Sequence, residues 1–246
     1  MTAIANRKGM LGAVVAMFMA VAAAGCAVEE DGLGAAAPAG DEPVAAQESE
    51  VSCNGLLCYS SGCTSVGLAR TGACVAAESR WCRDRGFGMG VSQQLGNGVI
   101  GTLCAPATQK RIWKSTLTAR HSGCTSTTLP QDPNCMAAVH RECQSFGFTG
   151  GISQEEGAWD VTAACFNAPF YADIPLSELT ARHPGCASAG QSQTNDCVAA
   201  IDGACHARNY AGGIAQEVGY RWPLGWVFGV ACFDAATSFR YDAPIL

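Results

Sequence analysis

The sequence predicts an α+β fold of three small tandem modules, each a helix packed on a β-hairpin and stapled by disulfides. Three observations predict this fold. Twelve cysteines recur as three sets of four, a helical pattern carries the second and third cysteine of each set, and a strand–turn–strand pattern ends on the fourth. We expect a signal segment and a disordered tether to precede the modules.

The cysteine spacing defines the repeats. Successive gaps are 11, 8 and 22 residues in the first two sets and 11, 8 and 27 in the third. The first cysteines of successive sets lie 61 and 62 residues apart. Self-similarity at a fixed period is the sequence signature of repeated structural units. We therefore place the repeats at 53–115, 116–177 and 178–246.

One helix is expected in each repeat, within residues 71–86, 131–147 and 194–209. Asp132 is a natural N-cap, and Pro133 suits the first helical position. Each segment ends on a residue that tolerates the left-handed conformation of a C-terminal cap. These residues are Gly86, Gly147 and Asn209.

A β-hairpin follows each helix. Its first strand reads GVSQQ, GGISQEE or GGIAQEV, and its return strand reads VIGTLC, VTAAC or VFGVAC. Asn97-Gly98 is a strong turn signal in the first repeat. Because side chains alternate along a strand, a recurrent glutamine is expected to point inward and satisfy backbone groups. It occurs as Gln93, Gln154 and Gln216.

Geometry restricts the disulfide pairing. Four cysteines allow three pairings, and the second and third lie eight residues apart on one helix. That spacing is about 12 Å, too far for a disulfide. The fourth cysteine lies beside the start of the hairpin, near the third. We predict Cys63–Cys74, Cys82–Cys104, Cys124–Cys135, Cys143–Cys165, Cys186–Cys197 and Cys205–Cys232, with Cys53–Cys58 left over. Zinc is disfavoured because no CxxC pair occurs, so we expect no metal and no cofactor.

Residues 1–25 have the pattern of a signal peptide. Arg7 and Lys8 precede an apolar stretch that is too short to span a bilayer. The following AAAGCA resembles the cleavage box of bacterial lipoproteins, although Ala23 stands where that family usually has Leu. The resemblance implies lipidation of Cys26 and a membrane-anchored protein of the bacterial cell envelope. Cleavage at small residues and free secretion is the alternative.

Residues 26–52 are expected to form a disordered acidic tether. They hold seven acidic residues, no basic residue and no aromatic residue, so they cannot bury enough apolar surface to offset chain entropy. Residues 53–246 carry 13 basic and 14 acidic residues, so the repeats are nearly neutral. No basic face for nucleic acid is implied, and membrane contact is expected through the lipid anchor only.

The motif LTARHSGC and its second copy LTARHPGC suggest a structural ion pair. Arg120 and Arg182 recur with the strand residues Glu155 and Glu217, whereas the first repeat has Tyr59 and Gln94 at these positions. We therefore expect Arg120 to pair with Glu155 and Arg182 with Glu217. A catalytic use would need the adjacent histidine beside a nucleophile, but the cysteine is assigned to a disulfide. No other enzyme motif is present, so we assign no catalytic residue.

The third hairpin carries the strongest binding signal. Its extended tip, GYRWPLGW, holds residues typical of binding hot spots. The candidate ligand-binding residues are Tyr220, Arg221, Trp222 and Trp226, with Trp159 at the second tip. The alternative is that these aromatic residues pack one repeat against the next.

The run GFTGGISQEE, between two cysteines, is similar to cysteine-rich modules of the WSC and PAN/apple kind. That resemblance covers part of each repeat and implies binding of carbohydrate or protein by analogy. The sequence as a whole predicts a non-catalytic, envelope-anchored protein presenting three stapled repeats to a glycan or protein ligand. A structural or assembly protein of the envelope, or an enzyme or protease inhibitor, is the alternative.

Overall fold

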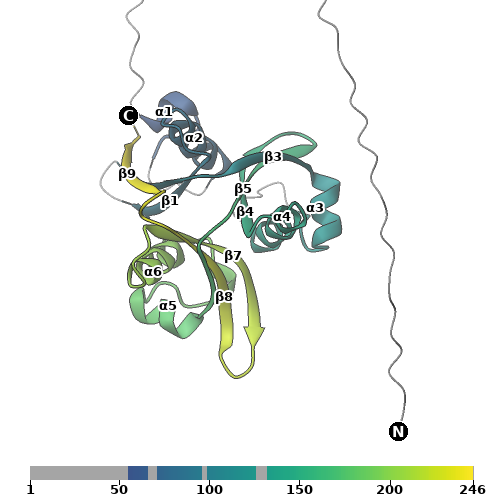
Figure 1. Ribbon diagram of the computed structural model, residues 1–246, viewed down its shortest axis with the longest axis vertical. Coiled ribbons are helices and arrows are strands. Elements are labelled where there is room, and N and C mark those ends of the chain that lie inside the picture. The colour runs from purple at the N-terminus through teal and green to yellow at the C-terminus, as the bar shows by residue number, and fades with distance from the viewer. Residues whose placement is uncertain (1–54, 66–70, 96–98, 126–131, 246) are drawn as a thin grey trace, which may run out of the picture. The chain divides into compact units, whose positions relative to one another are not determined.

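A computed structural model describes residues 55–65, 71–95, 99–125 and 132–245. In this part the chain forms a mixed helix-and-sheet fold with three small antiparallel sheets (Figure 1). The predicted signal peptide and tether, Cys26, and the turn at Asn97-Gly98 lie outside the described residues. None of the helices in the described ranges is long and apolar enough to span a membrane.

The described helices are α1 (Leu56–Tyr59), α2 (Gly72–Arg83), α3 (Lys114–Arg120), α4 (Pro133–Ser145), α5 (Leu176–Arg182) and α6 (Asn195–His206). The strands are β1 (Met89–Leu95), β2 (Val99–Ala105), β3 (Thr108–Trp113), β4 (Gly150–Glu156), β5 (Asp160–Phe166), β6 (Phe170–Pro175), β7 (Gly212–Arg221), β8 (Gly225–Phe233) and β9 (Phe239–Pro244). A short 3₁₀ turn covers Ala189–Gln191.

Helices α2, α4 and α6 lie within the three predicted ranges. Asp132 caps α4 by accepting hydrogen bonds from the N–H groups of Asn134 and Cys135. Thr71 and Thr194 cap α2 and α6 in the same way. The residues predicted to follow the helices have positive φ: Gly86 (85°), Gly147 (88°) and Asn209 (65°). The sequence therefore locates both ends of each long helix.

Each sheet has a third strand that the sequence analysis did not predict. The strand orders are β1-β2-β9, β3-β5-β4 and β6-β8-β7. In each sheet the third strand therefore pairs with the return strand of the hairpin. For the second and third sheets this strand directly precedes the short helix, α3 or α5. For the first sheet it is β9, the last strand described.

Strand β9 joins the last part of the described chain to the first repeat. It pairs antiparallel with β2 along six residue pairs. Just beyond it, the Leu57 N–H donates to the Ile245 carbonyl at 2.9 Å. Ala243 and Ile245 are buried in one cluster with Leu56, Trp81 and Ile100. The first repeat therefore obtains its third strand from the opposite end of the described residues.

The six predicted disulfides of the three repeats are confirmed: Cys63–Cys74, Cys82–Cys104, Cys124–Cys135, Cys143–Cys165, Cys186–Cys197 and Cys205–Cys232. Cys58 is disulfide-bonded as well, and its predicted partner Cys53 lies outside the described residues.

A glycine opposite each fourth cysteine makes room for the disulfide to the helix. In the second sheet Gly151 lies directly across from Cys165, and a Cβ on Gly151 would stand 2.1 Å from the Cys143 sulfur. Gly213 has the same relation to Cys205, at 2.2 Å. A larger residue would force the helix away from its strand.

The core has local and shared parts. Each repeat has its own cluster around its disulfides. A further cluster draws buried side chains from all three sheets and contains Met89, Val91, Leu103, Ala105, Ile152, Ala164, Phe166, Ile214, Ala231 and Phe233. Phe166 and Phe233 meet there edge to face with centroids 4.9 Å apart. The repeats consequently share apolar surface.

Candidate functional site

The recurrent glutamines connect neighbouring repeats. Each lies at a β-bulge, where the register of the hairpin shifts, and each is at least 99 % buried. Each side-chain oxygen accepts from a glycine N–H of another repeat: Gln154 from Gly90 at 3.1 Å, Gln216 from Gly151 at 2.8 Å, and Gln93 from Gly213 at 2.9 Å. The bonded backbone groups thus lie in the neighbouring repeat, and the three bonds link the repeats in a ring.

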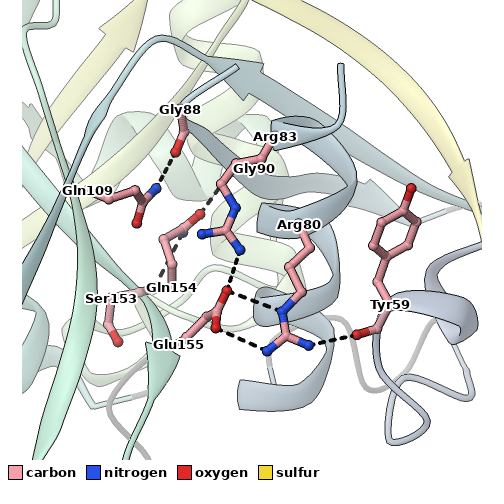
Figure 2. A network of polar contacts seen from close by, with 9 residues as sticks. All are labelled: Tyr59, Arg80, Arg83, Gly88, Gly90, Gln109, Ser153, Gln154 and Glu155. Carbon is pink, nitrogen blue, oxygen red and sulfur yellow. Dashed lines mark hydrogen bonds and ion pairs between the residues drawn. The ribbon is translucent and has the colours of Figure 1, made fainter. Parts of the chain in front are cut away.

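The predicted ion pairs within one repeat, Arg120–Glu155 and Arg182–Glu217, are wrong. Glu155 instead pairs with Arg80 at 3.0 Å and with Arg83 at 2.6 Å, both on α2 of the first repeat (Figure 2). Glu217 pairs with Arg141 of α4 at 3.7 Å.

Arg120 and Arg182 have other partners. Arg120 pairs with Glu142 on the adjacent α4, and Arg182 pairs with Glu178 on its own helix at 3.1 Å. The cause is the bulge at the glutamine. It shifts the register before the next residue, so the following glutamate contacts the helix of the preceding repeat instead of its own.

The arginines that pair with these two glutamates are a second recurring set, distinct from Arg120 and Arg182. Arg80 and Arg141 stand two residues before the third cysteine, where the third repeat has Gly203. Their partners Glu155 and Glu217 align with Gln94 of the first repeat. Both ionic residues are thus replaced at the contact between the third repeat and the first.

The two ionic contacts differ in how tightly the glutamate is held. At the first, Arg80 also donates to the Tyr59 carbonyl, and Gln109 donates to the Gly88 carbonyl nearby (Figure 2). Hydrogen bonds from Arg80, and then from Arg83, lower the pKa of Glu155 against the opposing effect of burial. At the second, Glu217 has the single longer contact with Arg141. Among the described residues, the second contact is the more open.

The aromatic residues at the hairpin tips are exposed. Trp222 is 85 % exposed, Tyr220 58 % and Trp226 49 %. Trp159, which aligns with Trp226 six residues before the fourth cysteine, is 78 % exposed. The alternative that these residues fill a core between repeats is therefore wrong. Arg221 pairs with Asp173 at 3.4 Å.

Two hollows flank Trp226. One, of about 240 Å³, lies between α4 and β7 and is lined by His121, Asn134, Arg141 and Glu217 besides Trp226. The other, of about 600 Å³, is bounded by α5 and the hairpin tip and is mainly apolar, with Leu176 and Leu224 on its sides. Trp226 is the residue that both linings share. We call the two hollows together the Trp226 groove.

A third hollow of about 160 Å³ adjoins the first through Arg141 and Glu217. Its charged lining is completed by Asp173 and Arg221. Two cationic and two anionic side chains, from α4, β6 and β7, therefore line this hollow. Such a surface offers hydrogen-bond donors and acceptors without a strong net charge.

Packing orients the indole ring of Trp226. The ring of Tyr220 lies edge to face against it, with centroids 5.8 Å apart and an interplanar angle of 85°. The two residues are also directly paired across β7 and β8. An oriented, half-exposed aromatic ring beside a few polar groups is the usual composition of a small-ligand site.

A buried histidine of α4 contacts the glutamine of the third repeat. His140 is 2 % exposed, and its Nδ1 lies 3.0 Å from Gln216 Oε1. Because an amide oxygen only accepts, Nδ1–H is the donor. The ring stacks on Tyr171 with an interplanar angle of 8°. Burial lowers the pKa of His140 and raises that of Tyr171, so both side chains are neutral at pH 7. Their contacts join α4 to β6 and β7.

The two histidines of the LTARH motif have different surroundings. His121 lines the smaller hollow, and its Nδ1 accepts from the Gly123 N–H at 3.2 Å. His183 lies 3.5 Å from Asp196. The two copies of the motif therefore contribute His121, Thr180 and Ala181 to the lining of the Trp226 groove.

Sequence reasoning missed Asn134, Arg141 and Glu217 as members of a site. A comparison of neighbouring repeats could have found the charged pair, because Arg141 of the second repeat contacts Glu217 of the third.

The comparisons give no relative for this chain. No family model, no curated protein and no solved structure matches it.

Proposed function

We propose that this is an exported, non-catalytic binding protein of the bacterial cell envelope that binds a glycan in the Trp226 groove. In this proposal the chain folds as three tandem modules, each a helix on a hairpin, and the modules form a rigid support for one ligand site. The observation that carries the proposal is that Trp226 is half exposed, oriented by Tyr220, and part of the lining of two hollows.

The chemistry of the groove suits a sugar. A pyranose ring has an apolar C–H face that stacks on an indole, and a rim of hydroxyl groups that both donate and accept. Asn134, Arg141 and Glu217 supply both hydrogen-bond partners on one side of Trp226. Leu176 and Leu224 supply apolar contact on the other side. An elongated oligosaccharide would lie across the indole and use both hollows.

Among the described residues, only the contact between the second and third repeats combines these features. At the equivalent contact between the first and second repeats, Glu155 is held by two arginines. At the contact between the third and first repeats, Gly203 and Gln94 replace the ionic residues. We therefore propose one ligand site per chain.

Export is supported by the disulfides, because such bonds persist in oxidising compartments outside the cytosol. Anchoring through Cys26 rests on the lipoprotein-like cleavage box of the sequence. Mass spectrometry of the mature N-terminus tests that part by itself: an acylated N-terminal cysteine supports the anchor, and an unmodified terminus at another residue refutes it.

A glycan array probed with the purified protein tests the binding function. We expect binding to a subset of bacterial cell-wall or surface oligosaccharides, and a loss of at least about tenfold in affinity for Trp226→Ala, the size of a hot-spot contact. The matched control is Trp159→Ala, which removes the aligned tryptophan of the second repeat.

Two results would contradict the glycan proposal. One is the absence of binding to every glycan on the array. The other is an equal loss for both tryptophan variants, which would show that the groove has no special role. Capture of a defined envelope protein through Trp226, without glycan binding, would assign the groove to a protein ligand.

A further inference from the structure

The end of the β7–β8 hairpin holds an apolar side chain that the proposed glycan site does not explain. Trp222 is 85 % exposed and lines none of the described hollows. Figure 1 shows this hairpin extending past α5. We call residues 220–224 the hairpin tip.

The hairpin tip is convex at Trp222. An indole that is 85 % exposed makes few contacts with its own chain, so no neighbouring element forms a pocket around it. A ligand of small size would gain little from such a side chain, because binding sites for small molecules are concave. A convex apolar tip is buried when it enters a deformable apolar phase.

The charges around the hairpin tip favour a lipid surface. From Gly219 to Phe228 the sequence holds no acidic residue and one basic residue, Arg221. Insertion would therefore desolvate no carboxylate of the tip, which is the costliest step for a protein segment entering a bilayer. Tryptophan and tyrosine prefer the membrane interface because each joins an apolar ring to a polar N–H or O–H group.

We propose that the hairpin tip inserts into the interfacial layer of a phospholipid bilayer, with Trp222 as the inserted side chain. Tyr220 and Arg221 would lie at the level of the headgroups. This proposal adds a second membrane contact to the one expected from Cys26, and it does not depend on glycan binding.

If Cys26 carries the anchor, the hairpin tip belongs to a chain that is already held at a membrane. The local lipid concentration then makes a weak contact sufficient. Partition of the tip would orient the three repeats relative to the membrane.

Fluorescence quenching by brominated lipid tests the proposal on the full chain. The protein is reconstituted in vesicles of phosphatidylethanolamine and phosphatidylglycerol whose acyl chains carry bromine near the headgroup. Bromine quenches only tryptophans in contact with the acyl chains, so a lipid anchor alone gives no signal. We expect quenching in the wild type, most of which is lost in Trp222→Phe, because phenylalanine still inserts but no longer reports.

Two further variants make the result specific. Trp159→Phe, which removes a similarly exposed tryptophan from another hairpin, should leave the quenching unchanged. Trp222→Glu should abolish the quenching of the remaining tryptophans, because the charge prevents insertion. Both replacements lie at exposed positions, and circular dichroism verifies their folding.

Absence of quenching in the wild type would overturn the proposal, as would equal loss in Trp159→Phe and Trp222→Phe. Crosslinking of the hairpin tip to a protein in place of lipid would also overturn it and assign the tip to a protein groove. Because glycan binding is measured separately through Trp226, failure of either proposal leaves the other identifiable.

Discussion

At the scale of single residues, the bulge glutamines explain how the repeats are held in register. Each buried amide oxygen satisfies a strand N–H of another repeat. Removing the acceptor leaves a buried donor unpaired, which costs about 1–3 kcal/mol. Gln216→Leu should therefore lower the free energy of unfolding by that amount, measured by urea denaturation. Gln144→Leu, at an exposed position of α4, is the control and should change stability by less than about 0.5 kcal/mol.

A second prediction concerns the pH dependence of stability. Because Arg80 and Arg83 lower the pKa of Glu155 in the folded protein, the ionised carboxylate stabilises the fold. That contribution is complete above the ordinary carboxyl value of 4.5. It is lost as the pH falls through the lowered pKa.

Glu155→Gln should thus be less stable than the wild type at pH 7, and the difference should shrink as the pH falls below 4.5. Unfolding curves of both proteins from pH 7 to pH 3 give the comparison. A difference that stays constant over this range would show that the carboxylate charge has no part in the contact.

At the scale of elements, glycine determines how closely helix and strand approach. Gly151→Ala would place a Cβ 2.1 Å from the Cys143 sulfur, so we expect destabilisation of several kcal/mol or a shifted disulfide. Gly203→Ala is the matched control. It lies within α6 with nothing within 4 Å of the added Cβ, and it should stabilise the protein by up to about 1 kcal/mol. Thermal unfolding of the two variants should move in opposite directions.

The C-terminal strand offers another test at this scale. Ile245 is buried beside the first repeat, and truncation of a buried isoleucine costs about 2–5 kcal/mol. Ile245→Ala should therefore destabilise the protein by that amount and accelerate hydrogen exchange in β2. Asp242→Ala, at an exposed position of β9, should leave β2 protected. Unchanged exchange in both variants would mean that β9 contributes little to the first sheet.

The long helices, their caps, the hairpins and the disulfides could be predicted because their signals are local. Cysteine spacing, a capping aspartate and an alternating strand lie within a few residues of the element that they define. The third strands were missed because each lies outside the four-cysteine frame and pairs with a more distant return strand. The related segments TQKRIW, FYADIP and FRYDAP were a usable signal. They occur after each fourth cysteine, and no such segment precedes the first set.

The ion pairs illustrate a different limit. The sequence pattern suggested Arg120 and Arg182 as the partners of Glu155 and Glu217, but the partners are Arg80, Arg83 and Arg141 of the preceding repeats. That choice depends on the bulge at Gln154, which directs Glu155 toward α2 of the preceding repeat. Exposure of the tip aromatics likewise depends on packing between repeats.

At the scale of the whole molecule, three features join the repeats: the ring of glutamine bonds, the shared apolar cluster and the pairing of β9 with β2. The same fold leaves the third hairpin with the two hollows that share Trp226. In the proposed function the repeats are the support, and the contact between the second and third repeats provides the ligand site.

The most direct test of this account is a titration of the protein with an array-selected oligosaccharide, followed by the indole N–H signals of its five tryptophans in a ¹H–¹⁵N spectrum. Assignment uses single Trp→Phe variants. We predict that the Trp226 signal shifts saturably while those of Trp81, Trp113 and Trp159 stay in place. A saturable shift at Trp159 with none at Trp226, or no shift at any indole, would contradict the account.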